Sequence, residues 1–544
     1  MKGARNQRNI RRKQVLVSTT DGGPWWRSAV IYQVYPRSFA DGNGDGVGDI
    51  GGIRAHLGHL RDLGVDAIWM SPWYPSPMAD AGYDVADFRD IDPVFGSLTE
   101  AETLIEEAHA AGIRMIVDIV PNHISSEHPW FKAALADPDA PERELFWFRP
   151  GRGENGDEMP TDWRGEFDGT TWTRTADGQW YLHLFAPEQP DLNWDHPKVR
   201  EEFESILRFW FDRGVDGIRI DSAALLLKDP SLPEVMADTP HPFHDLDGVH
   251  DVYRAWRRVS DSYDGDRALI GEVWMPEVER FANYLRPDEL HAAFNFDLLG
   301  CAWDPVLMRE SIDRTLHAHA AVGAPATWVL SNHDVTRHVT RYGREDTTFS
   351  FDNNLDGTPV DLELGTRRAR AAALLSLSLP GATYIYQGDE LGLWENEAIP
   401  EDQRQDPMWA RRGHGREGCR VPLPWSGDES PFGFSTVTPW LPQPADWKGL
   451  TAQAQSGDPS SMLSLYRSAI ALRRAEPGLH EPAMAWIDLH PEVLAYCRGA
   501  AFACVVNMSG ASVALPDHES LLLASGPLDG DRIPPDTAVW LRMR

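Results

Sequence analysis

Short apolar strands alternate with helical segments along most of the 544-residue chain, and this alternation limits the fold more than any other feature. Strands that are joined by helices pair in parallel, and eight such units can close into a barrel. Helical spacing predicts helices that include 53–63, 99–111 and 461–474. We therefore predict an α/β fold built on a (β/α)8 TIM barrel. Its strands are predicted at 29–35, 67–70, 114–120, 217–220, 268–271, 292–294, 327–330 and 383–386.

Two stretches interrupt the alternation and predict additional domains. Residues 123–195 follow the third strand, are rich in Trp, Gly, Asp and Pro, and are too long for a simple loop, so we expect a small inserted subdomain. Residues 481–544 contain hairpin-like segments and predict a C-terminal antiparallel β-sheet domain. The catalytic barrel would then comprise 24–122 and 196–480, preceded by a flexible tail at 1–23.

The composition argues against several classes of partner. Asp and Glu number 83 against 51 Lys and Arg, a formal net charge of −32. Such a surface repels phosphates, so we expect neither nucleic acid nor an anionic membrane as partner. The longest apolar run, 371–386, is shorter than the ~20 residues that span a bilayer, and no apolar signal core follows the basic start. Four widely spaced cysteines without a C-x-x-C pair favour a reducing compartment, so we expect a cytoplasmic protein.

Polar residues stand where several predicted strands end. In a parallel barrel the loops that follow the carboxyl ends of the strands build the active site, so these side chains should converge at one rim. Three of them are carboxylic acids. One acid alone at the rim would not indicate catalysis, but three together could carry acid–base or nucleophilic chemistry. The converging residues are Asp221, Glu272 and Asp334, with Arg219, His123 and His333.

These strand-end segments, in this order, resemble the signature regions of glycoside hydrolase family 13, the α-amylase family. The resemblance covers residues 25 to 480 and rests on 118–123, 219–221, 271–274 and 331–334. The segment Gln189-Pro190-Asp191-Leu192-Asn193 resembles the mark of the oligo-1,6-glucosidase and α-glucosidase subfamily, as do 388–392 and 415–422.

The resemblance implies how the rim acids act. Cleavage of a glycosidic bond with retention needs an ionised nucleophile and a protonated acid about 5 Å apart. The family pattern makes Asp221 the nucleophile, Glu272 the acid and later the base, and Asp334 the group that grips the sugar 2- and 3-hydroxyls. Arg219, two residues before Asp221 on one strand face, is expected to hold Asp221 charged while Glu272 keeps its proton.

Further residues are expected to bind the sugar, again by resemblance. Asp84, paired with an arginine, would hold the terminal glucose, with Arg416 as the expected partner and Arg420 as the alternative. A closed clamp of this kind accepts chain ends rather than the middle of a polymer. The remaining predicted sugar-binding residues are Tyr83, Phe167, Phe185 and Gln189 as walls, and His123 and His333 as hydrogen-bond donors.

An acidic, glycine-rich segment follows the first predicted strand. Oxygen ligands at alternate positions and glycines that permit a sharp turn suit calcium, although Gly52 stands where an EF-hand has a bidentate glutamate. By resemblance this loop binds a structural Ca²⁺, or alternatively Mg²⁺, away from the chemistry, and no organic cofactor is expected. The predicted ligands are Asp41, Asn43, Asp45, the Val47 carbonyl and Asp49.

The leading functional hypothesis is a retaining, exo-acting α-glucosidase that releases glucose from short α-glucosides through a covalent glucosyl-Asp221 intermediate. An acceptor hydroxyl could intercept this intermediate, which would give transglucosylation. In the family a valine after the nucleophile accompanies α-1,6 cleavage, so Ser222, Ala223 and Ala224 favour α-1,4 substrates such as maltose.

Three alternatives remain at this stage. The first is an oligo-1,6-glucosidase. The second is an isomerase or α-glucosyl transferase, although 341–344 departs from the Arg-x-Asp-Arg loop of sucrose isomerases. The third is a non-catalytic binding homologue similar to transporter heavy chains, which carry a membrane span and lack catalytic acids. The sequence leaves both monomer and homodimer open.

Overall fold

The structure, a computed structural model, describes residues 13–15, 23–236, 241–351 and 355–544. Eight parallel strands form one sheet in the order β10-β9-β8-β4-β3-β2-β12-β11. A parallel bridge between Asn295 and Trp328 links its two ends, so the sheet curves into a nearly closed barrel. Its strands are β2 (Val30–Val34), β3 (Ala67–Met70), β4 (Arg114–Ile119), β8 (Gly217–Ile220), β9 (Ala268–Gly271), β10 (Ala292–Ala293), β11 (Thr327–Val329) and β12 (Ala382–Tyr386).

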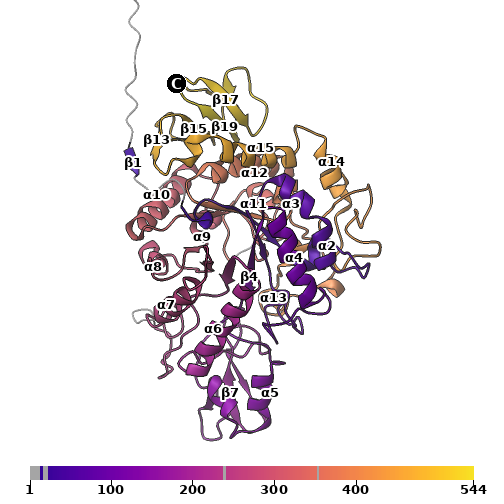
Figure 1. The fold of residues 1–544 in the computed structure, drawn as a ribbon, viewed down its shortest axis with the longest axis vertical. Helices are drawn as coiled ribbons and strands as arrows, with labels where there is room; N and C mark the ends of the chain where they lie inside the picture. The colour runs from indigo at the N-terminus through magenta and orange to yellow at the C-terminus, as the bar shows by residue number, and fades with distance from the viewer. Residues whose placement is uncertain (1–12, 16–22, 237–240, 352–354) are drawn as a thin grey trace, which may run out of the picture.

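Helices surround the barrel and cover its outer face (Figure 1). The predicted helix at 53–63 is two helices, because the chain breaks at His56, whose ring nitrogen contacts the Gly52 carbonyl oxygen at 2.9 Å. The helices are α1 (Pro36–Phe39), α2 (Ile50–Ala55), α3 (Leu57–Leu63), α4 (Leu98–Ala110), α5 (Pro129–Ala136), α6 (Pro197–Asp212), α7 (Val249–Ser260), α8 (Val278–Asn283), α9 (Phe296–Gly300), α10 (Pro305–Val322), α11 (His338–Tyr342), α12 (Leu362–Ser378), α13 (Met408–Arg412), α14 (Ala452–Ser456) and α15 (Met462–Ala475).

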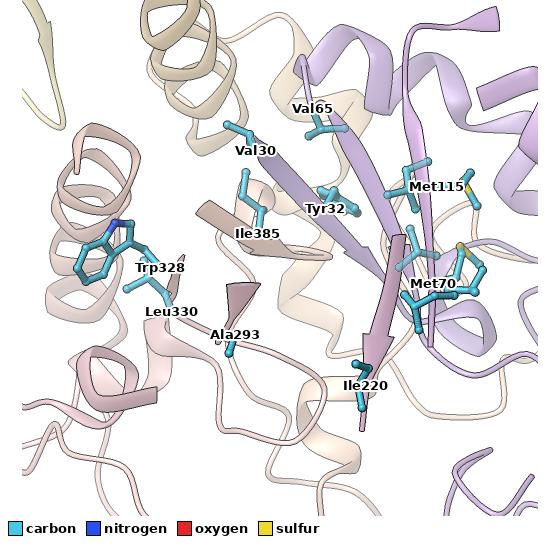
Figure 2. Packing of buried hydrophobic residues seen from close by; sticks show 14 of the residues in the cluster. Val30, Tyr32, Val65, Met70, Met115, Ile220, Ala293, Trp328, Leu330 and Ile385 are labelled. Atoms are coloured by element: carbon cyan, nitrogen blue, oxygen red, sulfur yellow. The ribbon is translucent and has the colours of Figure 1, made fainter. Parts of the chain in front are cut away.

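Alternate residues of each barrel strand face opposite sides. Tyr32 and Met70 belong to the apolar layer between strands and helices (Figure 2), whereas Trp69 belongs to the cluster that fills the barrel interior. In the parallel register Asp118 of β4 pairs with Arg219 of β8. The same two-residue alternation therefore sends both charged side chains into the barrel, directly below its carboxyl-terminal rim.

The segment between β4 and α6 forms the predicted insertion. It contains α5 and a three-stranded antiparallel sheet in the order β5-β7-β6. Bridges of His123 with Asp191 and of Phe146 with Leu192 join the beginning of the segment to its end. The insertion therefore projects from the third barrel strand beside the rim (Figure 1). Its strands are β5 (Phe148–Pro150), β6 (Trp172–Arg174) and β7 (Gln179–Leu182).

The C-terminal region forms an antiparallel sheet in the order β1-β13-β14-β15-β19-β17. Trp540 of β19 is buried against α12, where its indole N–H donates to the Leu374 carbonyl oxygen at 3.1 Å. A small β16-β18 pair lies beside this sheet. The strands are β13 (Met484–Trp486), β14 (Val493–Arg498), β15 (Phe502–Asn507), β16 (Val513–Ala514), β17 (Ser520–Ala524), β18 (Arg532–Ile533) and β19 (Thr537–Arg542).

The architecture confirms the predicted barrel, insertion and C-terminal sheet. The predicted N-terminal tail is wrong at β1 (Lys13–Val15), which pairs antiparallel with β13 at the edge of the C-terminal sheet. Residues 1–12 and 16–22 of that tail lie outside the described residues. Within the described ranges, no helix combines the length and apolar character that crossing a bilayer requires.

Replacing Trp540 with alanine should lower the free energy of unfolding by about 3–5 kcal/mol, because it opens a cavity between α12 and the C-terminal sheet. Urea-induced unfolding of the full chain measures the change. Leu521 of β17 is 43% exposed, so Leu521→Ala in the same sheet should stay within roughly 0.5 kcal/mol of wild type. Equal effects of the two changes would contradict this packing.

Candidate active site

A cavity of about 740 Å³ opens at the carboxyl-terminal rim of the barrel. Polar strand-end residues and the inserted segment contribute to its wall, as the sequence led us to expect. Eight predicted residues line it: Tyr83, His123, Phe167, Phe185, Asp221, Glu272, Asp334 and Arg416. Five predicted residues lie behind this wall: Asp84, Gln189, Arg219, His333 and Arg420.

One guanidinium connects the acids at the centre of the site. Arg219 Nη1 donates to Asp221 Oδ1 at 2.7 Å, and Nη2 lies 2.7 Å from Glu272 Oε2. Arg219 Nη1 also lies 3.0 Å from Asp118 Oδ1, deeper in the barrel. Arg219 is buried, and its charge holds the carboxyls of Asp221 and Glu272 close together away from solvent.

Arg219 does not ionise Asp221 selectively. Burial raises the pKa of Asp221 well above its usual range; Arg219 opposes this, while Glu272 and Asp118 raise the pKa further. Burial likewise raises the pKa of Asp118 to about 7. Asp118, Asp221 and Glu272 all contact this one guanidinium, so the arginine is not dedicated to Asp221, and the expected division of charge between Asp221 and Glu272 stays a prediction. Such a group titrates as a coupled unit.

Ser222 contacts both rim acids. Its backbone N–H donates to Glu272 Oε2 at 3.0 Å, and its hydroxyl donates to Asp221 Oδ2 at 2.9 Å. The residue has a φ of 47°, a left-handed conformation that costs energy for a residue with a side chain. Trp274 completes the set by donating its indole N–H to Glu272 Oε1 at 2.9 Å.

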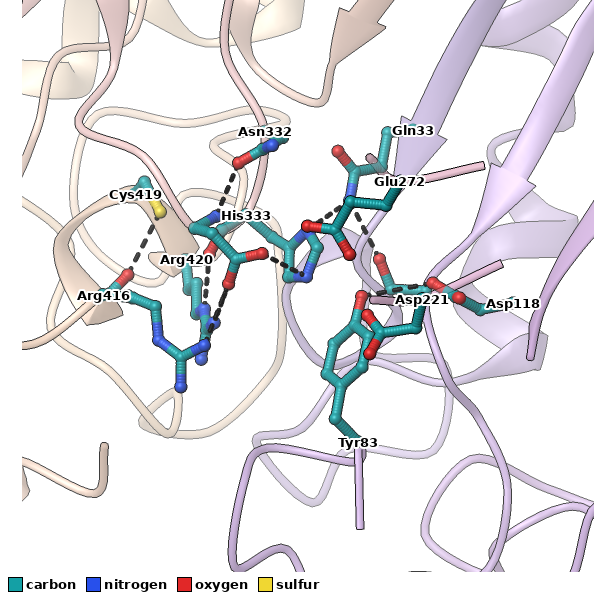
Figure 3. Close-up of polar contacts among 12 residues, drawn as sticks. Gln33, Tyr83, Asp118, Asp221, Glu272, Asn332, His333, Arg416, Cys419 and Arg420 are labelled. Atoms are coloured by element: carbon teal, nitrogen blue, oxygen red, sulfur yellow. Dashed lines mark hydrogen bonds and ion pairs between the residues drawn. The ribbon is translucent and has the colours of Figure 1, made fainter. Parts of the chain in front are cut away.

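Asp334 lies on the other side of the cavity among positive groups. Arg416 Nη1 and Arg420 Nη2 donate to its Oδ1 at 3.0 and 2.9 Å. Although burial favours the neutral form, His333 and the two arginines hold the pKa of Asp334 well below its usual range. The charged form of Asp334 is therefore favoured, and the two arginines that hold it, Arg416 and Arg420, lie across the site from Asp221 (Figure 3).

His123 and His333 are neutral and are buried among neighbouring side chains. Burial lowers the pKa of His123 to about 4 and that of His333 to about 3. The Gln33 amide donates to His333 Nδ1 at 2.8 Å, and Tyr83 stacks on the same ring at 5.1 Å. Only His123 reaches the cavity wall, so the structure makes His333 a support for Tyr83 and Asp334 rather than a wall residue.

The acid that faces Arg416 is Asp80, not the predicted Asp84. Arg416 Nη2 donates to Asp80 Oδ1 at 2.6 Å, and both residues line the cavity. The carboxylate of Asp84 instead accepts hydrogen bonds from Ser76 and from the backbone N–H groups of Ala79 and Asp80. The carboxylate of Asp84 is therefore occupied by hydrogen bonds within its own turn, and this turn places Asp80 at the cavity wall.

The structure also distinguishes the two candidate arginines. Arg416 lines the cavity, whereas Arg420 lies behind it and donates to the His333 carbonyl oxygen at 2.7 Å as well as to Asp334. Asp406 supports Arg416 from behind, with 2.6 Å between its Oδ2 and the arginine Nε. Gln189 also supports the wall from behind. It is fully buried, and its side-chain amide donates to Asp80 at 3.0 Å.

Sequence reasoning missed several residues of the site. Asp118 could have been found, because it lies on the same strand face and in the same register as Arg219. Trp274 also stands at a strand end, two residues after Glu272, whereas the remaining residues come from segments between the strands that no local pattern marks. The missed residues are Asp118, Asp80 and Asp406, and the wall residues Glu166, His244, Trp274, Phe349, Phe351, Met408 and Arg412.

The predicted metal loop lies away from this cavity, beside residues 435–440. Asp41 accepts from the backbone N–H groups of Asn43, Gly44 and Gly46, and Asp49 accepts from Gly42 and Gly52. No cluster of three or more His, Cys, Asp or Glu side chains placed to hold a metal occurs in the described part of the chain. The loop does supply carboxylate and amide oxygens, the donors that Ca²⁺ and Mg²⁺ prefer, so the metal stays a prediction.

Together, the barrel and the paired carboxyls in the cavity at its rim define the class of protein as a barrel enzyme. The chain matches the family described as "Alpha amylase, catalytic domain" over residues 33–481. It belongs to this family, glycoside hydrolase family 13, and is a glycoside hydrolase.

Individual relatives agree with this assignment. The chain is 36% identical to a "Probable alpha-glucosidase" of Rhizobium meliloti (strain 1021), with 89% of each chain covered. It is 35% identical to an "Oligo-1,6-glucosidase" of Parageobacillus thermoglucosidasius, which covers 83% of this chain and 84% of that relative. Its fold is similar to the crystal structure of the α-glucosyl transfer enzyme XgtA, with a TM-score of 0.83, 34% identity, and 96% of this chain and 100% of that chain covered. The chain therefore acts on glucosides, by hydrolysis or by transfer.

Replacing Ser222 with alanine should shift the acidic limb of the pH profile of kcat/KM to higher pH by about one unit. The hydroxyl favours the charged form of Asp221, so its loss raises the pKa, and activity that needs this carboxylate ionised disappears at a higher pH as the pH falls. Initial rates on an aryl glycoside measure the profile. Ser222→Gly also lacks the hydroxyl but accepts the left-handed backbone, so it should shift the limb in the same direction. An unchanged limb in both variants would contradict the role of this hydrogen bond.

Proposed function

We propose that the protein is a retaining, exo-acting α-glucosidase that releases glucose from the non-reducing end of short α-glucosides. The observation that carries the proposal is the arrangement of Asp221 and Glu272 on one buried guanidinium, opposite the Asp80–Arg416 pair. The first pair supplies the chemistry, and the second supplies charged hydrogen-bonding groups for the hydroxyls of a terminal sugar.

In the proposed reaction Asp221 attacks the anomeric carbon while Glu272 donates its proton to the leaving oxygen. The covalent glucosyl-Asp221 intermediate then reacts with water, from which Glu272 removes a proton. Before attack, the proton shared by the buried carboxyls must reside on Glu272. The Ser222 hydroxyl and Arg219 both favour charge on Asp221, which supports this distribution once the sugar is bound.

Asp334 fits the role of a transition-state ligand. Its carboxylate stays charged among Arg416, Arg420 and His333, and it faces the cavity. Hydrogen bonds from sugar hydroxyls to a fixed anion strengthen as positive charge develops on the ring. We therefore assign Asp334 to the 2- and 3-hydroxyls of the reacting glucose.

The charge of the cavity favours a neutral substrate. Five acids line it, Asp80, Glu166, Asp221, Glu272 and Asp334, against the two arginines Arg412 and Arg416. Both arginines are already engaged, Arg412 with Asp168 at 3.0 Å and Arg416 with Asp80 and Asp334. A phosphorylated sugar would meet this surplus of carboxylates, so unmodified oligosaccharides suit the site better.

The proposal also covers which glycosidic linkage is cleaved and whether glucose is transferred to an acceptor sugar. Ser222, the residue after the nucleophile, lines the cavity, and its small side chain is engaged with Asp221, which supports α-1,4 substrates such as maltose. Transfer to an acceptor sugar uses the same intermediate and is the second candidate function. The structural similarity to an α-glucosyl transfer enzyme favours it.

Purified protein assayed on maltose, isomaltose and sucrose tests the proposal. We expect glucose from maltose faster than from isomaltose, first released with the α configuration, and no isomerised sucrose. Asp221→Ala should lower kcat on an aryl α-glucoside by at least about 10³-fold, because no covalent intermediate forms. The exposed Asp402→Ala is the matched control. Faster isomaltose cleavage overturns the linkage assignment, and an active Asp221→Ala variant overturns the nucleophile.

We also propose that the loop at 41–49 binds a structural Ca²⁺, with Mg²⁺ as the alternative. Asp41, Asn43, Asp45, Asp49 and the Val47 carbonyl would provide its ligands, and the ion would stiffen the turn after β2. The two residues of this loop with positive φ, Gly44 and Gly46, allow the sharp curvature that such ligation needs.

Removing the metal should lower the thermal unfolding midpoint. An ion present at 100 times its dissociation constant stabilises the folded chain by about 2.7 kcal/mol, and a chelator removes that contribution. Differential scanning calorimetry with EDTA, and after return of Ca²⁺ or Mg²⁺, measures it. Asp45→Ala should abolish the response, whereas Asp402→Ala should retain it. A wild-type midpoint that ignores EDTA and added Ca²⁺ would contradict a metal in this loop.

The protein is further proposed to act in the cytoplasm. All four cysteines, Cys301, Cys419, Cys497 and Cys504, are free thiols. Burial raises the pKa of Cys301 and of Cys419, which keeps both as unreactive thiols. This pattern supports a reducing compartment.

A further inference from the structure

A second cavity, of about 420 Å³, lies at the opposite end of the barrel from the active site. Its wall contains Val30 at the start of β2, Arg114 at the start of β4, and Ala326 and Gly381 just before β11 and β12. All four mark the amino-terminal ends of barrel strands. The C-terminal sheet closes the cavity from the other side through Arg498 of β14.

This cavity is rich in arginine, although the chain as a whole carries a net charge of −32. Its lining includes the guanidinium side chains of Arg27, Arg114, Arg473, Arg474 and Arg498. The carboxylate in the lining is that of Asp66, which pairs with Arg474 at 2.6 Å. Within the described ranges no ion pair is found for the other four arginines, so the cavity concentrates positive charge.

Neutral groups hold these arginines in place. Arg473 donates to the carbonyl oxygens of Ser28 and Gly381, at 3.2 and 2.5 Å. Arg498 donates to the Ser378 carbonyl oxygen at 3.1 Å. These contacts fix the guanidinium groups without cancelling their formal charge. Burial lowers the pKa of Arg473 to about 10 and of Arg498 to about 9, and Arg473 lowers that of Arg498 further.

Two more arginines reach the cavity from its outer side. Arg27 donates to the Gly323 carbonyl oxygen at 2.9 Å, and the Arg114 guanidinium lies 5.2 Å from the centre of the Trp25 ring. Neither contact involves a carboxylate. A polyvalent anion in the cavity would offset the positive charge of these arginines and reduce the repulsion between Arg473 and Arg498.

We propose that this cavity binds a small phosphate-bearing anion. Arginine matches phosphate because its planar fork donates two parallel hydrogen bonds to two phosphate oxygens. The volume suits a pyrophosphate or a phosphorylated monosaccharide rather than a polymer. Because the wall joins the barrel strands to the C-terminal sheet, the bound anion stabilises the association of these two regions. The site is independent of the function proposed above.

Isothermal titration calorimetry of the full chain with pyrophosphate, at matched ionic strength, tests this site. We expect saturable binding with one anion per chain and a higher thermal unfolding midpoint. Competition by inorganic phosphate or by glucose 6-phosphate distinguishes a free phosphate from a sugar phosphate as the preferred form. No saturable binding by any of the three probes overturns the proposal.

Variants locate the binding. Arg114→Ala removes a guanidinium that lies over the Trp25 ring and forms no ion pair within the described residues, so folding should survive, and it should weaken pyrophosphate binding by at least 10-fold. Arg27→Ala is the second variant and should act in the same direction. Arg152→Ala, which removes an exposed arginine of the inserted segment, is the charge-matched control and should bind normally. Equal loss in the control, or unchanged binding in both cavity variants, overturns the assignment to this cavity.

Discussion

The catalytic end of this protein depends on one buried guanidinium. Arg219 is the cation that Asp118, Asp221 and Glu272 share, and without it three carboxyls would be enclosed in the barrel with no counter-charge. Burial disfavours the charged form of each acid, and the positive charge of the arginine opposes this effect at Asp118 and at Asp221. A retaining glycosidase needs one charged and one protonated carboxyl, and in the proposed mechanism these are Asp221 and Glu272, which both contact this cation.

A second ionic cluster shapes the opposite wall of the cavity. Asp80, Asp334 and Asp406 meet at Arg416, although these residues come from four separate segments of the chain. Each loop is therefore positioned by the others, and the cavity depends on all of them being in place. In the proposed function, the charges that hold this wall also bind the hydroxyls of a terminal sugar, so the cluster would have both a structural role and a binding role.

The two ends of the barrel differ in charge. Carboxylates dominate the cavity at the carboxyl-terminal rim, and guanidinium groups dominate the cavity at the amino-terminal end. The acidic end suits neutral sugars and cationic transition states, and the arginine-rich end suits an anion. One barrel can carry both environments because its packed interior separates them, with Trp69 and Phe294 among the filling side chains.

The sequence by itself determined the architecture and the central acids. Strand and helix periodicity is local, so it predicts the barrel, and the ends of strands mark Asp221, Glu272 and Asp334 as rim residues. Only the tertiary structure decided between loop residues: Asp80 rather than Asp84, and Arg416 rather than Arg420. It alone revealed the sharing of Arg219, the pairing of β1 with β13, and the arginine-rich cavity. The reason is physical: loop positions and pKa values depend on contacts between segments far apart in the chain, and local periodicity carries no information about them.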